Sequence, residues 1–427
     1  MHETARGTRS AVSHRVAVTG MGVVTPLGIG IDAFWAGVLA ERIAVRTIAR
    51  FPTAGYASTM AAEIDDFDPA AFIGSKRLRW TDRFSQFALA ATRLAVDDAG
   101  FRVDGDGSDV GVYVGSALGG LAYADEQHDV FRANGLDAIR PLLAISVFGG
   151  AATCNVAMEF GLHGPSVANG NSCASGAVAI GDAFRAVARG DVRAALAGGC
   201  EAPLAPLVFG AFTVIHAMST RNADPAGACR PFDRDRDGFV MAEGAAMLVL
   251  ERRDDALARG ARIYGEIAGY GLTNDAYHMT APQPEGTHNA LAMRRALAEA
   301  GVTPRDVDLI NAHGSGTVLG DRGEAAALRL VFGPDAERIP LTATKGQHGH
   351  ALGATGAWEA ALSLLAIARG RAPRVVNCEA PAGDCAVGVL RAPGAFAPRV
   401  VLSSSAGFGG INAALVFTRA GARTEEG

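Results

Sequence analysis

The sequence predicts an α/β fold in which helices cover buried, largely parallel sheets, and it predicts that this arrangement is built twice. Apolar runs typical of strands alternate with runs of small residues at helical spacing, a pattern that indicates sheets covered by helices on their faces. The 54 glycines and the 49% hydrophobic content favour tight turns and close packing between these elements. A chain of 427 residues is long enough to bury a large core.

Three kinds of segment occur in the same order in each half of the chain. An apolar strand first runs into a glycine turn, a second turn then leads into a helix of small residues, and another apolar strand finally ends in glycines. The paired segments are 15–28 and 263–275, 171–184 and 345–365, and 194–201 and 399–410. Identity between the halves is slight, so the repeat is one of element order rather than a solenoid period. We therefore expect an N-terminal half over 15–262 and a C-terminal half over 263–420, joined by a charged helix over 251–262.

Composition excludes several classes of partner. The net charge of −5 gives no general attraction to nucleic acid or to anionic membranes, and no uncharged apolar stretch is long enough to span a bilayer. Residues 1–14 are polar and lack the apolar region of a signal peptide. The six cysteines have no framework spacing, which is typical of reduced thiols. We expect a cytoplasmic protein that binds neither nucleic acid nor a membrane.

Cys173 is the first candidate for chemistry. A strand-like approach ends in 169–172, a helical pattern begins at the cysteine, and Gly190 ends it. The unpaired N–H groups and the positive dipole end of such a helix favour the thiolate, which is the reactive form. Most free cysteines are buried structural residues, so the local sequence leaves the nucleophile and the structural cysteine equally open.

Three further turns combine glycines with a reactive or aromatic side chain. His313 lies in 311–324, Lys345 and His350 lie in 344–357, and Phe408 lies in 403–412. Each also has a purely structural interpretation, as a hydrogen-bonded core histidine, a surface lysine or a turn aromatic. Four such turns at the ends of apolar strands nevertheless indicate a single site.

Metal and dinucleotide motifs fail in detail. The acidic run 233–244 resembles a calcium loop, but its twelfth position is Gly244 and Glu243 comes one residue early, so we expect the aspartates to fix a turn. His348 and His350 lack a third metal ligand nearby. The turn after the first strand has Thr25 at the third glycine position of a dinucleotide fingerprint. We expect no metal and no cofactor bound by the protein.

Taken in order, these motifs resemble those of the β-ketoacyl-acyl-carrier-protein synthases, condensing enzymes of the thiolase superfamily, over residues 15–418. The resemblance lies in NSCASG around Cys173 and in the segments 197–207, 218–245, 274–286, 311–324, 344–357 and 407–412. It implies a thiolase-like duplicated fold, layered α-β-α-β-α, with two mixed five-stranded sheets. The chain looks most similar to the long-chain elongating synthases of type II fatty-acid synthesis and to their polyketide counterparts.

The resemblance implies a role for each candidate. Cys173 would attack the thioester of an acyl carrier protein and hold the acyl chain, and the backbone N–H groups of Cys173 and Phe408 would form an oxyanion hole. His313 and His350 would donate hydrogen bonds to the malonyl thioester oxygen during decarboxylation. Phe408 would also gate the passage between the acyl pocket and the malonyl group.

Other positions would support these residues. Lys345 and Glu324 would form an ion pair, and Ser315 and Thr317 would contact the phosphopantetheine arm that carries the substrates. The remaining substrate-binding positions implied by the resemblance are Leu118, Ala406, Gly407 and Gly409.

Departures from the family pattern bear on the substrate. Ser404 and Ala406 stand where fatty-acid elongating relatives often carry asparagine and phenylalanine, and losing the aromatic ring leaves space. We therefore expect a bulkier or more rigid acyl chain, in a specialised polyketide, polyene or fatty-acid pathway, with housekeeping fatty-acid elongation as the alternative. The modest size of Leu118 argues against a short-chain limit.

A basic segment is the expected docking site for the acidic carrier protein. Its cations are Lys76, Arg77, Arg79 and Arg83. An ordinary solvated helix face is the alternative. Because Trp80 and His216 replace positions that are basic in relatives, we expect a dedicated carrier protein.

Three other functions compete with a condensing enzyme. A chain-length-factor subunit shares the fold but lacks the cysteine, so the presence of Cys173 argues against it. A thiolase uses a second cysteine as base, so the set of two histidines argues against it. A cysteine hydrolase needs neither a lysine nor a gating phenylalanine, so the presence of both argues against it. The resemblance also implies a dimer, and the sequence leaves open a homodimer or a heterodimer with a chain-length-factor-like subunit.

Overall fold

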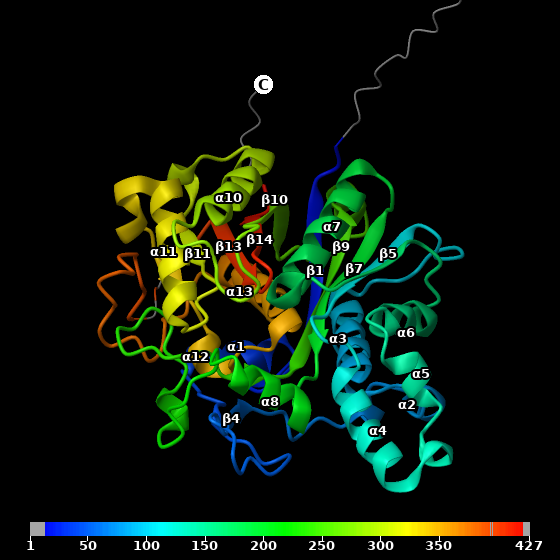
Figure 1. Cartoon of the computed structure of the whole chain (residues 1–427). Coiled ribbons are helices and arrows are strands. Elements are labelled where there is room, and N and C mark those ends of the chain that lie inside the picture. The colour runs from blue at the N-terminus through cyan, green and yellow to red at the C-terminus, as the bar shows by residue number, and fades with distance from the viewer. Residues whose placement is uncertain (1–12, 393, 395, 422–427) are drawn as a thin grey trace, which may run out of the picture.

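Ten strands, five from each half of the chain, follow one another in the main sheet (Figure 1), and β2 (Gly28–Ile29) joins the sheet by pairing with β1 (Val16–Thr25). The computed structural model describes residues 13–392, 394 and 396–421. The strands of the N-terminal half are β1 (Val16–Thr25), β5 (Val110–Gly115), β6 (Ser166–Asn169), β7 (Ala194–Glu201) and β9 (Gly244–Arg252). Those of the C-terminal half are β10 (Gly265–Asn274), β11 (Leu309–Asn311), β12 (Leu341–Thr342), β13 (Val400–Gly407) and β14 (Ile411–Thr418). The short strands are β2 (Gly28–Ile29), β3 (Arg46–Thr47), β4 (Met60–Ala62) and β8 (Met241–Ala242).

Strand directions repeat between the halves. In the first half β5 is parallel to β6 and β7, whereas β9 is antiparallel to β7 and β1. In the second half β11 is parallel to β12 and β13, whereas β14 is antiparallel to β13 and β10. The repeat of element order seen in the sequence is therefore a repeat of structure.

The two sets of five strands are hydrogen-bonded to each other. β1 and β10 pair antiparallel through Val16–Ile267, Ala17–Glu266 and Val18–Gly265. The layered α/β class and the mixed strand directions are confirmed, but the expectation of two separate sheets is wrong. The edge strands β1 and β10 run side by side here, and pairing them satisfies backbone groups that two separate sheets would leave exposed.

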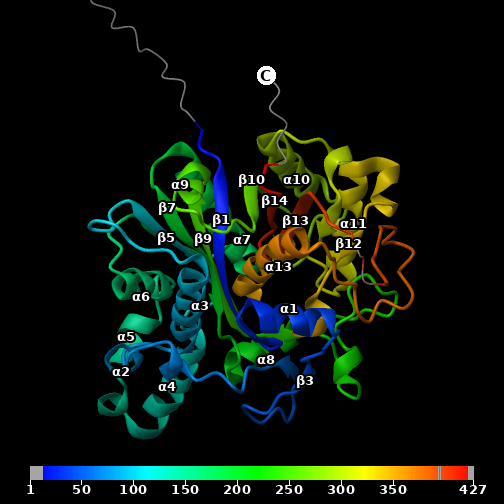
Figure 2. The ribbon, with the colours of Figure 1, turned by 180° about the vertical axis from the view of Figure 1, so that it is seen from behind.

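Helices cover the outside of both sets of strands and fill the space between them (Figures 1 and 2). α3 packs against β1 and β9, α10 packs against β10 and β14, and α7 and α13 pack against each other between the strands. The α-helices are α1 (Ile31–Leu39), α2 (Ser75–Leu78), α3 (Arg83–Ala99), α4 (Leu121–Asn134), α5 (Leu142–Ser146), α6 (Ala151–Phe160), α7 (Ser175–Arg189), α8 (Pro206–Val214), α9 (Arg253–Ala258), α10 (Thr287–Ala300), α11 (Val318–Phe332), α12 (Lys345–His348) and α13 (Thr355–Arg369). The 3-10 helices are η1 (Pro69–Ala71), η2 (Leu136–Ala138), η3 (Ser172–Ala174), η4 (Pro225–Gly227), η5 (Pro304–Asp306), η6 (Gly333–Glu337) and η7 (Leu352–Ala354).

The two inner helices start in the same way. α7 follows η3 and α13 follows η7, and each of these 3-10 turns opens on a non-glycine residue of positive φ, Ser172 at 52° and Leu352 at 42°. The helix starts also touch, because a Cβ on Gly176 would lie 2.7 Å from the carbonyl oxygen of Gly353. Small residues at the start of the inner helices therefore bring the two halves together beside Cys173.

One expectation from the sequence is adjusted by the fold. The charged helix predicted over 251–262 is shorter, since β9 continues to Arg252 and α9 covers Arg253–Ala258. Among the described residues, no helix has the length and apolar character needed to cross a membrane. Most of the polar segment 1–14 lies outside the described residues.

Candidate active site

Cys173 lies in the turn between β6 and α7. The positive φ of Ser172 is costly for a non-glycine residue and is typical of turns that position a functional side chain. Gly407 of β13 comes so close that a Cβ there would lie 3.2 Å from the Cys173 nitrogen. Cys173 is 8% exposed and belongs to an apolar cluster with Phe239 and Leu352. The thiol is therefore held in place by both halves of the chain.

The structure changes the expectation about the ionisation of Cys173. Burial raises the pKa of the thiol to about 11, although Ser172, the charge of Lys345 and the backbone N–H of Phe408 act in the opposite direction. The helix N-terminus was expected to lower this pKa, and burial outweighs it. The resting thiol is therefore protonated near neutral pH, and its proton must leave as the sulfur attacks.

The rate of Cys173 alkylation should report this protonation state. Because the thiolate fraction rises tenfold for each pH unit below the pKa, the rate with iodoacetamide should rise about tenfold per unit between about pH 7 and pH 9. Mass spectrometry of the Cys173 peptide at each pH gives the rate for this cysteine alone. A rate that levels off near pH 7 would show that the helix end lowers the pKa after all.

His313 is positioned by the carboxylate of Glu324. His313 follows β11 directly, and Glu324 lies on α11. The backbone N–H groups of His313 and Gly314 donate to the two carboxylate oxygens of Glu324, each at 2.8 Å. Gly314 has a φ of 42°, so the chain turns sharply after the histidine. Glu324 thus fixes the backbone from which the imidazole projects.

Lys345 pairs with Glu359 and not with Glu324, so the predicted ion pair is wrong. The ammonium of Lys345 donates to the Glu359 carboxylate and to the carbonyl oxygen of His313, and all three residues are buried. Glu324 already accepts two backbone N–H groups, whereas Glu359 on α13 presents its carboxylate to the lysine. Lys345 therefore ties the start of α12 to the inner helix and to the His313 backbone.

Contacts with Lys345 also fix the protonation of His313. The lysine nitrogen lies 3.5 Å from His313 Nδ1, and because an ammonium can only donate, that ring nitrogen must accept. In the neutral ring the proton then sits on Nε2. Burial, the charge of Lys345 and the neighbouring His350 keep the pKa of His313 well below its usual value. His313 is thus a neutral imidazole with an Nε2–H donor.

His350 stands beside His313 with its own anchors. Its backbone N–H donates to Val240 at 2.7 Å, and its Nδ1 lies 2.9 Å from the Thr355 hydroxyl. The two imidazole rings meet edge to face with centroids 5.4 Å apart, and Phe239 packs against His350 at 5.3 Å. Burial and Lys345 keep the pKa of His350 well below its usual value. Two neutral imidazoles therefore meet at one point.

Phe408 stands at the end of β13 on a glycine-rich turn. Its ring lies nearly parallel to that of Phe212 on α8, with centroids 6.2 Å apart and 16° between the planes. Gly409 has a φ of 81° and donates its N–H to the Met279 carbonyl at 2.7 Å. The Asn274 side chain donates to the Gly409 carbonyl at 2.8 Å. The loop 274–286 thus holds the turn that carries Phe408.

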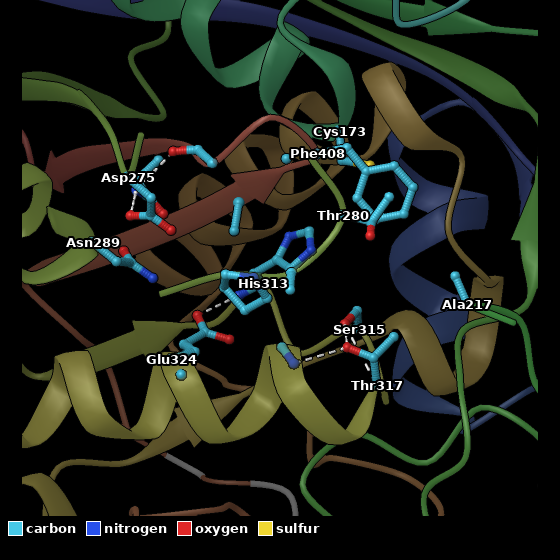
Figure 3. A pocket seen from close by; sticks show the side chains of 18 of the residues that line it. Cys173, Ala217, Asp275, Thr280, Asn289, His313, Ser315, Thr317, Glu324 and Phe408 are labelled. Carbon is cyan, nitrogen blue, oxygen red and sulfur yellow. Dashed lines mark hydrogen bonds between the residues drawn. The ribbon is translucent and has the colours of Figure 1, made fainter. Parts of the chain in front are cut away.

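These residues enclose one cavity (Figure 3), which is lined by most of the predicted site residues. The predicted residues that line it are Cys173, His313, Ser315, Thr317, Glu324, His350, Ala406, Gly407 and Phe408. Lys345 lies behind the histidines, Leu118 packs at the margin of the Cys173 cluster, and Gly409 lies in the gate turn. A nucleophile and two neutral imidazoles, of which His313 carries an Nε2–H donor, therefore face a common space.

Comparison with known proteins agrees with this geometry. The sequence model for the N-terminal domain of beta-ketoacyl synthases matches residues 13–256, and the model for the C-terminal domain matches residues 264–379. The chain belongs to the beta-ketoacyl synthase family. It is therefore a member of a family of condensing acyltransferases.

Individual relatives cover nearly the whole chain. A 3-oxoacyl-[acyl-carrier-protein] synthase 2 of Coxiella burnetii is 40% identical, with 95% of this chain and 98% of the relative covered. A synthase 2 from Synechocystis is 39% identical with the same coverage. Among solved structures, the ishigamide ketosynthase/chain length factor has a TM-score of 0.90 at 35% identity, covering 96% of this chain and all of that one. The AntDE ketosynthase, solved with the acyl carrier protein AntF, has a TM-score of 0.87 at 32% identity, with 95% and 100% covered.

The predicted docking cations of this family member divide into two kinds. Arg83 pairs with the buried carboxylate of Glu243 at 2.8 Å, and Arg77 pairs with Glu159 at 2.6 Å. Both guanidiniums are partly exposed and have an acidic partner within the protein, and their role in docking stays a prediction. Lys76 and Arg79 are exposed, and among the described residues neither forms an ion pair.

Several ketosynthase cavity residues were not predicted. The aromatic ring of Phe212 has no sequence signal, since it lies in the apolar segment 206–214. Phe239 falls in 218–245, one of the segments that carry the family resemblance. Asp275, Asn289 and Asn412 form a polar side of the cavity, and the amide of Asn412 donates to the Asp275 carboxylate at 2.7 Å. Asp275 and Asn412 fall in motifs that carry the family resemblance, which is the signal that could have identified them.

The rejected metal motifs have structural roles in this ketosynthase. Asp233 accepts the backbone N–H groups of Asp235, Glu379 and Ala380, so the acidic run fixes a turn as predicted. Within the described part of the chain, no group of three or more histidine, cysteine or acidic side chains is placed to hold a metal ion.

Proposed function

We propose that Cys173 takes an acyl chain from a carrier protein as a thioester and that the same cavity condenses it with a carrier-bound malonyl group. The observation that supports this most is the pairing of a buried thiol with two neutral imidazoles in one cavity. A hydrolase needs one histidine that can accept a proton, whereas His313 presents an Nε2–H donor and burial lowers the pKa of both histidines.

In the first half-reaction, the Cys173 sulfur attacks the carbonyl carbon of the acyl thioester. The carbonyl oxygen becomes negative and is stabilised by the backbone N–H groups of Cys173 and Phe408. The bond between the acyl carbon and the phosphopantetheine sulfur then breaks. The departing sulfur takes up the proton that the Cys173 thiol gave up, and the acyl chain enters the apolar cluster behind Cys173.

In the second half-reaction, the malonyl group loses its carboxylate as carbon dioxide. The electrons of the broken C–C bond form an enolate, whose negative oxygen accepts hydrogen bonds from His313 and His350. The enolate carbon attacks the acyl-Cys173 carbonyl, the new C–C bond forms, and the C–S bond to Cys173 breaks. The sulfur leaves as a thiolate and takes up a proton from solvent, because its own proton left with the carrier thiol in the first half-reaction. Neutral imidazoles suit this step because a donor that keeps its proton stabilises the oxygen without quenching the carbanion.

Mass spectrometry tests this function directly. Incubation with an acyl carrier should add one acyl mass to the Cys173 peptide, and addition of malonyl carrier should release carbon dioxide and give a β-ketoacyl carrier. Cys173→Ala should give no adduct, whereas Cys154→Ala, which removes an exposed cysteine, should leave the adduct intact. Release of free acid without a condensed product would identify a cysteine hydrolase instead.

We also propose that the acyl chain is bulkier or more rigid than a saturated fatty acyl chain. Ala406 lines the cavity two residues before Phe408, and its methyl group leaves room beside the gate. Ala406→Phe should therefore lower the rate with a polyunsaturated acyl carrier by about tenfold relative to a linear saturated one. Equal rates for the two carriers in the unaltered protein would contradict the proposal.

The working assembly is proposed to be a dimer that covers β6. This strand is the edge of the main sheet and its residues Ser166, Val167 and Ala168 are exposed, so its free backbone groups are available to a second sheet. Similarity to a ketosynthase/chain length factor makes a heterodimer as open as a homodimer. The native mass of the protein alone and with a candidate chain-length-factor subunit distinguishes the two.

A further inference from the structure

A buried carboxylate that the proposed condensation does not use lies at the end of β7. Glu201 is the last residue of this strand, it is 0% exposed, and it does not line the catalytic cavity. Burying a carboxylate is costly unless hydrogen-bond donors satisfy its oxygens. The groups that donate to Glu201 therefore indicate what it does.

Four neutral groups from both halves of the chain donate to this carboxylate. The backbone N–H groups of Ala117 and Gly353 donate to Oε2 at 2.7 and 3.0 Å. The backbone N–H of Leu118 and the hydroxyl of Ser116 donate to Oε1 at 3.1 and 3.0 Å. Residues 116–118 follow β5, which runs beside β7 (Figure 1), whereas Gly353 lies in η7 of the C-terminal half. Glu201 therefore joins two turns that are far apart in the sequence.

The two turns contribute to the same apolar cluster. Leu118 packs against the cluster that contains Cys173 and Leu352, and the proposed function places the acyl chain there. Because Leu352 immediately precedes Gly353, the carboxylate holds the backbone at Leu118 and the backbone beside Leu352 in a fixed arrangement. A Cβ on Gly353 would lie 2.7 Å from Glu201 Oε2, so only glycine allows this close approach.

We propose that Glu201 is a positioning residue that selects the acyl chain held on Cys173 by fixing the wall that Leu118 forms. The inference rests on the proposed function, because it concerns the acyl chain on that sulfur. An acetyl group ends beside the sulfur, whereas a long chain extends into the cluster and contacts Leu118. Release of the Leu118 backbone should therefore weaken acylation by a long chain more than acylation by acetyl.

The substitution Glu201→Gln releases Leu118 in particular. A carboxamide has one oxygen that accepts and one nitrogen that donates, so it cannot accept from all four groups. When its oxygen faces Ala117 and Gly353, both backbone groups keep an acceptor. Its nitrogen then faces the Ser116 hydroxyl, which can rotate to accept, and the Leu118 N–H, which cannot. The opposite orientation is less favourable because it leaves two backbone donors without an acceptor.

Acylation of Cys173 by acetyl carrier and by dodecanoyl carrier, followed through the mass of the Cys173 peptide, tests this selection. In Glu201→Gln the ratio of the dodecanoyl rate to the acetyl rate should fall about tenfold, because the long chain loses apolar contact. Asp233→Asn is the matched control. Asp233 is also buried and accepts three backbone N–H groups, but these groups lie outside the cluster around Cys173, so the ratio should stay unchanged.

Two more variants show whether Glu201 acts through Leu118. Leu118→Ala should lower the ratio by a similar factor, and Glu201→Gln added to it should lower the ratio no further, since both remove the same contact. Ser116→Ala keeps the carboxylate but removes one of its donors and the acceptor of the Gly119 N–H. It should lower the ratio about threefold, and it decides the inference if Glu201→Gln does not fold.

The inference is overturned by a Glu201→Gln protein that acylates with both carriers at equally reduced rates, as a purely structural role would give, or at unchanged rates. Additive losses in the double variant, an unchanged ratio in Ser116→Ala, a ratio that Asp233→Asn lowers as much, or an unaltered protein that accepts acetyl alone would also overturn it. An unaltered protein that takes up no acyl group from any carrier would instead refute the proposed function, so the two failures are distinguishable.

Discussion

Replacing His313 by alanine is expected to slow the decarboxylation of malonyl carrier by about 10²–10⁴-fold while Cys173 still becomes acylated. The imidazole supplies an Nε2–H donor that stabilises charge only as carbon dioxide leaves, and the substitution removes one of the two imidazoles that line the cavity. Acylation depends on the sulfur and on backbone N–H groups, which the substitution leaves in place. Release of labelled carbon dioxide and the mass of the Cys173 peptide measure the two steps separately.

A matched control comes from the neighbouring histidine. His348 is buried and bonds to Thr344 and to the Gly349 carbonyl, but it does not line the cavity. His348→Gln should therefore keep decarboxylation, and His350→Ala should lose it as His313→Ala does. Loss of acylation together with decarboxylation in His313→Ala would mean that this histidine acts as the base for Cys173, contrary to its assigned role.

The candidate site could be predicted where a residue stands alone among glycines at the end of a strand. Cys173, His313 and Phe408 have this setting, because a strand end followed by small residues leaves room for a substrate. Phe212 and Phe239 could not be found in this way. Their place in the cavity wall depends on where α8 and the segment before β8 fold, and the apolar segment of Phe212 does not distinguish it from a core residue.

Interactions between distant segments were the least predictable part. Glu359 lies within an apolar helix, and only the packing of α13 against α12 brings it to Lys345. The pKa of Cys173 was expected to fall because the helix start is local and can be recognised in the sequence. The burial that raises the pKa comes from both halves of the fold and cannot be recognised in the local sequence. The single continuous sheet likewise depends on three residue pairs between β1 and β10.

Replacing Lys345 by methionine is expected to cost about 3–5 kcal/mol of folding free energy, because it leaves the Glu359 carboxylate buried without its partner. Burial already raises the pKa of Glu359 to about 7, and removing the lysine removes an influence that lowers it. A raised carboxyl pKa means that the folded state binds more protons than the unfolded state. The deficit should therefore be largest above about pH 7 and shrink as the pH falls below it. Urea unfolding at several pH values measures this dependence.

A second substitution separates the observed pair from the predicted one. Lys345→Met with Glu359→Gln should recover most of the lost stability and lose most of its pH dependence, since no unpaired carboxylate remains. Lys345→Met with Glu324→Gln should recover nothing, because Glu324 is held by the backbone N–H groups of His313 and Gly314. Neither double variant should regain decarboxylation, since without the ammonium nothing holds His313 Nδ1 as an acceptor and the Nε2–H donor is no longer fixed. Recovery of stability by the Glu324 substitution would instead support the ion pair between Lys345 and Glu324 that the family resemblance implied.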